Sequence, residues 1–178
     1  MRPGACRGAA RRVIRRKALI KIAGIALLAV LFSQEKANPQ YEYWSGCKVG
    51  SWVKNRMDME NQGQKFELES TTKLLEVTPE KILIETSMKT GQPRKTEIKA
   101  SDPQKGKTIV EKEEELTVAG KTLQCRYIEM ESEDTNKKKV TVKAWMSKEI
   151  PGGIAKSEVT SESMKGPIRT VALEWEKK

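Results

Sequence analysis

Apolar and polar side chains alternate along most of the chain beyond residue 50, and this period of two is typical of β-strands. The segment 66–74 has charged residues on one face and apolar or hydroxyl-bearing residues on the other. The second face carries Phe66, Leu68, Ser70, Thr72 and Leu74. The same alternation recurs in the segments 82–88, 94–100, 140–146 and 169–175. Each segment is therefore predicted to be a strand with one packed and one solvated face.

Short turn signals separate the predicted strands. Pro79 stands at the second position of a four-residue turn, Ala119-Gly120 falls between two alternating segments, and Pro151-Gly152-Gly153 closes a loop. The adjacent Leu74 and Leu75 interrupt the alternation and predict a β-bulge. Short connections favour antiparallel pairing between consecutive strands. The pattern therefore predicts an all-β fold, an antiparallel meander of about eight strands.

No convincing helical pattern follows residue 33, so the sequence offers nothing to cover the apolar face of this sheet. A sheet in that position must close on itself or fold over. We therefore expect a strongly curved sheet, either a half-barrel or a barrel. Ser70, Thr72 and Thr86 place hydroxyl groups on the inward face. This leaves two interpretations open, a cavity that holds water or a ligand, and a modest core.

The first 33 residues differ in charge from the rest of the chain. They contain eight of the 34 lysines and arginines and none of the 24 acidic residues. Residues 34–178 therefore carry a net charge of only +2, against +10 for the whole chain. An uncharged run of 11 residues, Ile22–Phe32, follows the basic positions. About 20 apolar residues are needed to span a bilayer, whereas a run of this length suits the hydrophobic part of an export signal.

Residues 1–33 are therefore predicted to be an N-terminal signal helix, which is cleaved or is retained as a membrane anchor. Residues 34–178 are predicted to be a single all-β domain. Either alternative places this domain outside the cytoplasm, in the periplasm or secreted, with membrane contact through the N-terminal segment. We expect no nucleic-acid partner, because the nearly neutral domain lacks the basic excess that neutralises phosphates.

The residue types of common catalytic sites are scarce. The chain has no histidine, only three aspartates and, beyond residue 33, only two cysteines. The lack of histidine excludes Ser-His-Asp and Cys-His nucleophile systems and His-ligated zinc. Glutamates are plentiful, but they stand beside lysines in the pattern of a solvated strand face. We therefore expect no enzyme activity, no catalytic residues, no metal and no cofactor.

Two cysteines and two tryptophans are candidate functional residues. Cys47 and Cys125 are a candidate disulfide, since exported proteins fold in an oxidising compartment. Alternatively, both are small buried apolar residues. Trp52 and Trp145 are candidate ligand contacts, and Trp145 falls on the polar face of its predicted strand. The alternative for both is a structural role with the indole N–H satisfied nearby.

Three stretches of the chain look familiar, namely Cys47–Val53, Val118–Cys125 and Trp145–Lys156. They resemble a group of uncharacterised secreted bacterial β-proteins of the kind abundant in planctomycetes. That resemblance brings no activity and no catalytic residue with it. In layout the chain is also similar, more distantly, to the periplasmic lipoprotein-carrier half-barrels. This second resemblance implies a concave sheet that holds an acyl chain.

Two functions remain open from the sequence. The first is an exported, non-enzymatic binding module of the bacterial cell envelope that holds an amphiphile or a peptide on a concave sheet. The second is a structural or interaction protein of the envelope that works through its sheet edges or charged outer face and has no small-molecule ligand. The one-sided strands, the export signal and the carrier-like layout favour the first.

Overall fold

The computed structural model describes residues 38–61, 64–101, 106–164 and 166–178. The predicted signal or anchor segment, residues 1–33, lies outside the described residues. In the part of the chain that the structure describes, no helix is long and apolar enough to cross a membrane.

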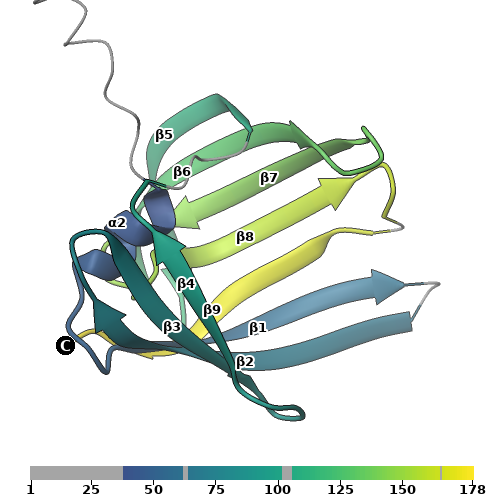
Figure 1. Cartoon of the computed structure of the whole chain (residues 1–178). Coiled ribbons are helices and arrows are strands. Elements are labelled where there is room, and N and C mark those ends of the chain that lie inside the picture. The colour runs from purple at the N-terminus through teal and green to yellow at the C-terminus, as the bar shows by residue number, and fades with distance from the viewer. Residues whose placement is uncertain (1–37, 62–63, 102–105, 165) are drawn as a thin grey trace, which may run out of the picture. The chain divides into compact units, whose positions relative to one another are not determined.

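The described residues form nine strands, and all nine belong to one antiparallel sheet (Figure 1). The strands are β1 (Trp52–Asn61), β2 (Gln64–Val77), β3 (Lys81–Met88), β4 (Arg94–Lys99), β5 (Lys107–Val118), β6 (Lys121–Glu133), β7 (Lys139–Met146), β8 (Ile154–Ser161) and β9 (Ile168–Glu176). Their order in the sheet is β4-β3-β2-β1-β9-β8-β7-β6-β5. The predicted all-β antiparallel meander is therefore confirmed, with one strand more than expected. The register of β2 against β3 shifts between Leu74 and Glu76, as the predicted bulge requires.

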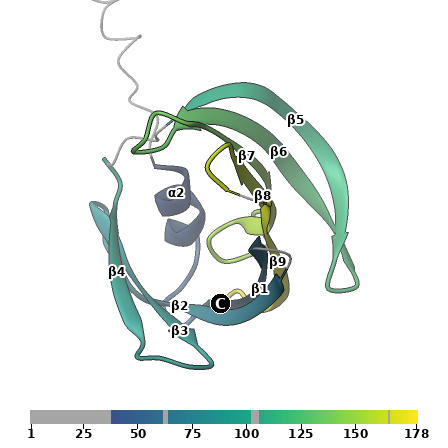
Figure 2. The same ribbon diagram turned by 90° about the vertical axis from the view of Figure 1, so that its right-hand side faces the viewer.

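The sheet stays open, so the expected closure into a barrel is wrong. Strands β4 and β5 follow each other in the chain, yet they form the two opposite edges of the sheet, and the described residues of these two strands do not pair. The strongly curled half-barrel is not borne out either. The sheet can stay open because its apolar face is covered by a helix that was not predicted from the sequence. A short helix, α2 (Pro39–Ser45), lies over part of this face, between β4 and the β5–β6 hairpin (Figure 2).

The expectation of no helix after residue 33 was thus also wrong. Helix α2 is only seven residues long, too short for a helical period to stand out in the sequence. Its start does have a local signal, because Asn38 caps the helix by accepting from Gln40 N at 3.0 Å and Pro39 follows directly. A helix this short is unstable alone. Tertiary contacts hold it, including the Tyr41 hydroxyl, which donates to Thr78 O and Pro79 O, each at 2.8 Å.

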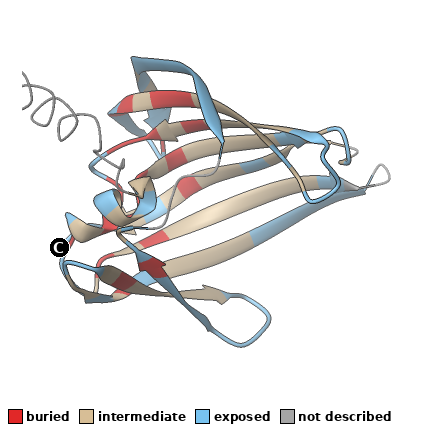
Figure 3. Cartoon of the chain, turned by 45° about the horizontal axis from the view of Figure 1, so that its top comes forward, coloured by how far each residue is buried: buried red, intermediate tan, exposed pale blue. Residues whose placement is uncertain are grey.

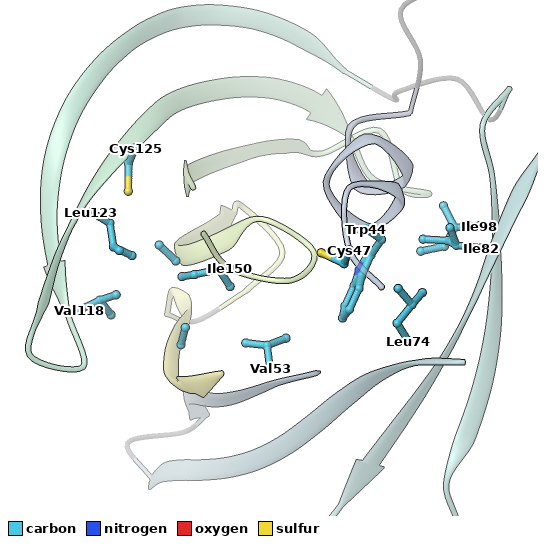
Figure 4. Packing of buried hydrophobic residues seen from close by; sticks show 12 residues of the cluster. Trp44, Cys47, Val53, Leu74, Ile82, Ile98, Val118, Leu123, Cys125 and Ile150 are labelled. Carbon is cyan, nitrogen blue, oxygen red and sulfur yellow. The ribbon is translucent and has the colours of Figure 1, made fainter. Parts of the chain in front are cut away.

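The hydrophobic core gathers toward the end of the sheet where α2 lies (Figure 3). The loop 147–153, between β7 and β8, adds Ile150 to this core, and the end of the β5–β6 hairpin adds three further residues (Figure 4). The buried cluster consists of Trp44, Cys47, Val53, Leu74, Ile82, Ile98, Val118, Leu123, Cys125, Ile150, Ala155 and Ala172. Tyr43 of α2 packs against a second, smaller cluster on β6 and β7. The helix and the loop therefore do the covering that a closed barrel would have done.

Candidate functional site

The candidate site is the part of the sheet face next to α2 that neither the helix nor the loop 147–153 buries. We call the face that α2 covers the inward face. Val53, Asn55, Thr72 and Ile84 lie on it, since they line one small cavity together with Trp44 of α2. Further along β1, the alternation of a strand places Met57 and Met59 on the same face.

An apolar row crosses six adjacent strands of the inward face. Met59 pairs with Phe66 across β1 and β2. Val159 pairs with Ile168 on one side and Val142 on the other. Val142 pairs in turn with Met130. Asp58 of β1 pairs with Arg169 of β9. The next position in this antiparallel register is Met59 opposite Ile168, and these two residues continue the row from β1 to β9. The apolar row thus consists of Phe66, Met59, Ile168, Val159, Val142 and Met130.

The apolar row is accessible, and it is narrowest on β8 and β9. Phe66 is 45% exposed, and the other five side chains are partly exposed. Neighbouring strands lie about 4.8 Å apart, so a row across six strands is about 24 Å long. On the α2 side it is bordered at β8 and β9 by Ser157 and Thr170, which pair with each other. On its other side Ser132 and Ser161 stand opposite Val140. The row is therefore bordered by hydroxyl groups on β8 and β9, whereas Met57 and Leu68 widen its apolar surface on β1 and β2.

Two grooves lie near the apolar row and α2. One has a volume of about 460 Å³, and it is lined by Met59, Phe66 and Pro167 at the β2 end of the row, together with charged residues of the strand ends. The other has a volume of about 390 Å³ and lies between α2 and the β5–β6 hairpin. One of its two cations, Arg126, is already paired with Glu111 at 2.8 Å, which raises the pKa of the guanidinium. Because Asp58, Glu67 and Arg169 alternate with inward-facing residues, the first groove lies mainly on the outward side of these strand ends and is not part of the apolar row.

The described residues show no group of three or more Cys, Asp or Glu side chains placed to hold a metal ion. Ser147, which stands beside Lys148 in sequence, is buried, and its hydroxyl oxygen accepts from Glu149 N at 3.3 Å. What the inward face offers chemically is therefore apolar contact and hydrogen bonding.

Trp145 lies on the opposite, outward face of the sheet. It pairs in register with Tyr127 and Lys156, and the two aromatic ring centroids are 5.0 Å apart. The indole N–H donates to a carboxylate oxygen of Glu114, and Lys156 Nζ lies 4.6 Å from the ring centroid. Burial and a hydrogen bond to Glu129 raise the pKa of Tyr127 to about 12. Trp145 is thus enclosed by its own neighbours.

Trp52 also lies on the outward face, because it alternates with the inward-facing Val53. Its indole N–H donates to Glu176 Oε2 at 3.1 Å. Both tryptophans proposed as ligand contacts therefore point away from the apolar row, and both have the satisfied N–H of the structural alternative. Most of the row was not predicted from the sequence. The alternation within each strand could have placed each member on the inward face, but not at the same height in neighbouring strands.

Cys47 and Cys125, the candidate disulfide pair, are both free thiols, and both are buried. Figure 4 shows Cys47 beside Trp44 and Cys125 beside Leu123, with Ile150 between them. Cys47 Sγ donates to Tyr43 O at 3.4 Å. Burial raises the pKa of both thiols. Both residues therefore occupy the small buried positions that the sequence analysis named as the alternative.

We expect Cys47 and Cys125 to resist alkylation in the folded protein. The thiolate is the reactive form, and burial both disfavours it and blocks access. Iodoacetamide at pH 8 should modify each of these thiols more than about tenfold more slowly in the native protein than in guanidinium chloride. Mass spectrometry of tryptic peptides resolves the two sites. Fast native labelling of either cysteine would contradict the buried placement.

Comparison of the chain with protein-family models and with curated proteins finds no match. The resemblance to secreted bacterial β-proteins therefore stays a prediction. The fold and the site by themselves define an open antiparallel β-meander that presents an accessible apolar row on the face partly covered by a short helix.

Proposed function

We propose that this protein is an exported, non-enzymatic binding module of the bacterial cell envelope, and that it holds an amphiphile whose apolar chain lies along the apolar row. The observation that carries the proposal is the row itself, six partly exposed apolar side chains on six adjacent strands. The basic and apolar N-terminal segment supports the location outside the cytoplasm.

The shape of the row favours a single acyl chain over a protein partner. A stable protein interface needs roughly 1,000 Å² or more of complementary surface, whereas the row is one side chain wide on β8 and β9, with hydroxyls beside it. A linear chain fits such a strip, and each buried methylene contributes about 0.8 kcal/mol. Met59 and Met130 belong to the row and Met57 lies next to it on β1, and methionine side chains adapt to ligands of different shape.

The alternative function is a structural or interaction protein of the envelope that has no small-molecule ligand. One observation favours it. Strand β5 is an edge strand of 12 residues whose side chains are mostly exposed, and an edge of this kind can pair with a strand of a partner. The charged pairs along the edge, such as Lys112 with Glu114, instead suit an edge protected against pairing. We therefore place amphiphile binding first.

The test places the same new charge on opposite faces of one strand. Val159→Asp puts a carboxylate into the apolar row, and Thr160→Asp puts it at the next position, on the outward face. We expect a pyrene-labelled fatty alcohol to bind the wild-type protein saturably and Val159→Asp to weaken binding at least about tenfold, since about 1.4 kcal/mol of apolar contact is lost. Thr160→Asp should bind as the wild type does.

Fluorescence titration measures the affinities, and thermal melts show that each variant is folded. No saturable uptake by the wild type over a wide concentration range would overturn the proposal. Equal weakening by the two variants would place the ligand elsewhere. If uptake is absent, crosslinking in intact envelopes that traps one dominant protein partner would support the alternative function.

A further inference from the structure

A small cavity lies under α2 at the inner end of the inward face. Its volume is about 120 Å³, room for roughly four water molecules at about 30 Å³ each. It is lined by Gln40, Trp44, Val53, Asn55, Thr72, Ile84, Pro151, Gly152 and Ile154. None of these nine residues carries an ionisable side chain. The cavity is therefore a neutral compartment with a few polar groups.

Two of those polar groups have no hydrogen-bond partner among the residues that the structure describes. Asn55 Oδ1 is fully buried and accepts no hydrogen bond. Trp44, which is only 4% exposed, differs from Trp52 and Trp145, because its indole N–H donates to no residue that the structure describes. The hydroxyls of Thr72 and Thr86, by contrast, bond to each other at 3.1 Å. Among the described residues, the cavity wall thus has one fully buried acceptor without a partner, Asn55 Oδ1, and one indole donor, Trp44 Nε1, with no bond to another described residue.

Leaving such groups unpaired is costly. A buried amide oxygen without a partner is unfavourable, because it has lost its hydrogen bonds to water and has gained none in the protein. A guest that carries both a donor and an acceptor would satisfy both groups at once. A carboxylate would offer acceptors only, and no cation lines the cavity to balance its charge.

The cavity and the apolar row lie on one path. Asn55, Met57 and Met59 follow each other on the inward face of β1, and Met59 belongs to the row. The distance from Asn55 to Met59 along the strand is about 13 Å. A ligand with its head in the cavity would therefore place its chain directly toward the row.

We propose that the cavity under α2 binds the head of the amphiphile, and that this head is a neutral group with a hydrogen-bond donor and an acceptor, an amide or a hydroxyl. Trp44 Nε1 donates to the head, and Asn55 Oδ1 accepts from it. The inference rests on the proposed function and adds to it the chemical class of the ligand. The protein then prefers acyl amides and long-chain alcohols to fatty acids of the same length.

The test compares dodecanamide with dodecanoate at pH 8 by displacement of the pyrene-labelled alcohol. We expect the wild type to bind the amide at least about tenfold more tightly than the carboxylate. Asn55→Leu and Trp44→Phe each remove one hydrogen-bonding group and keep most of the side chain's volume. Asn55→Leu should lower the preference for the amide about fivefold to tenfold, because only the amide can donate to Asn55 Oδ1. Trp44→Phe should instead weaken both ligands by a similar factor, because both offer an acceptor to the indole N–H. Trp52→Phe on the outward face is the matched control for Trp44→Phe and should leave both affinities unchanged.

The possible failures can be told apart. Equal affinity of the wild type for the two ligands, or a preference that survives in Asn55→Leu, overturns the inference and leaves the proposed function standing; the cavity then holds water only. If neither ligand displaces the probe, and the probe itself does not bind saturably, the proposed function fails as well. Thermal melts identify a variant that does not fold, and if Trp44→Phe is such a variant, Asn55→Leu alone decides the outcome.

Discussion

Gly152→Ala is expected to destabilise the protein by about 2–5 kcal/mol. Gly152 has a φ of +77°, a left-handed conformation that costs a residue with a side chain about 1–2 kcal/mol. A methyl group at this position would also lie 2.6 Å from Trp44 Nε1. Overpacking of this kind costs about 1–3 kcal/mol more, because α2 must move away from the sheet. Urea unfolding measures the loss, and the near-ultraviolet circular dichroism of the tryptophans reports the shift of α2.

Gly120→Ala is the control for the cost of the left-handed backbone conformation. Gly120 has a nearly equal φ of +73°, but no heavy atom lies within 4 Å of the position that a methyl group would take. The free energy of unfolding of this variant should fall only by the cost of the backbone conformation, about 1–2 kcal/mol. The difference between the two variants therefore measures the contact of α2 with the loop 147–153. Equal losses in the two variants would show that the helix is not seated on this loop.

Leu74→Ala is expected to cost about 2–5 kcal/mol, the usual range for a fully buried leucine. Leu74 is 0% exposed and lies close to Trp44 in the core (Figure 4). Its backbone is fixed on both sides, because Leu74 N donates to Ser51 O and Gly50 N donates to Leu74 O, each at 2.9 Å. The surroundings can therefore collapse only partly into the space that the truncated side chain leaves.

Leu75→Ala is the matched control, because it removes the same atoms one residue further along β2. Leu75 is only partly buried and stands at the bulge, outside the core cluster. We expect a loss of less than about 1.5 kcal/mol, from the transfer of a smaller apolar area. Chemical denaturation of both variants provides the comparison. A larger loss in Leu75→Ala than in Leu74→Ala would mean that Leu75, and not Leu74, points into the core at the bulge.

The candidate site could be predicted only in part. The alternation in β2 correctly put Phe66 and Leu68 on one face, because the side chains of a strand alternate wherever the strand pairs. Trp145 was correctly placed on the polar face of its strand, but its enclosure by Tyr127, Lys156 and Glu114 depends on contacts between strands far apart in the sequence. The unpaired groups of Trp44 and Asn55 could not be foreseen, since nothing local brings residue 44 over residue 55.

The amino-acid sequence by itself determined the strands, the turns between them and the antiparallel meander. The period of two, the Ala119-Gly120 turn and the bulge at Leu74 all act over a few residues, so they could be recognised without the rest of the fold. The tertiary structure alone decided that β4 and β5 remain separate edges, that α2 forms and covers part of the inward face, and that six apolar side chains align across six strands. These features depend on strand register and on packing such as that of Trp44 against Gly152, and both arise from contacts between residues distant in the chain.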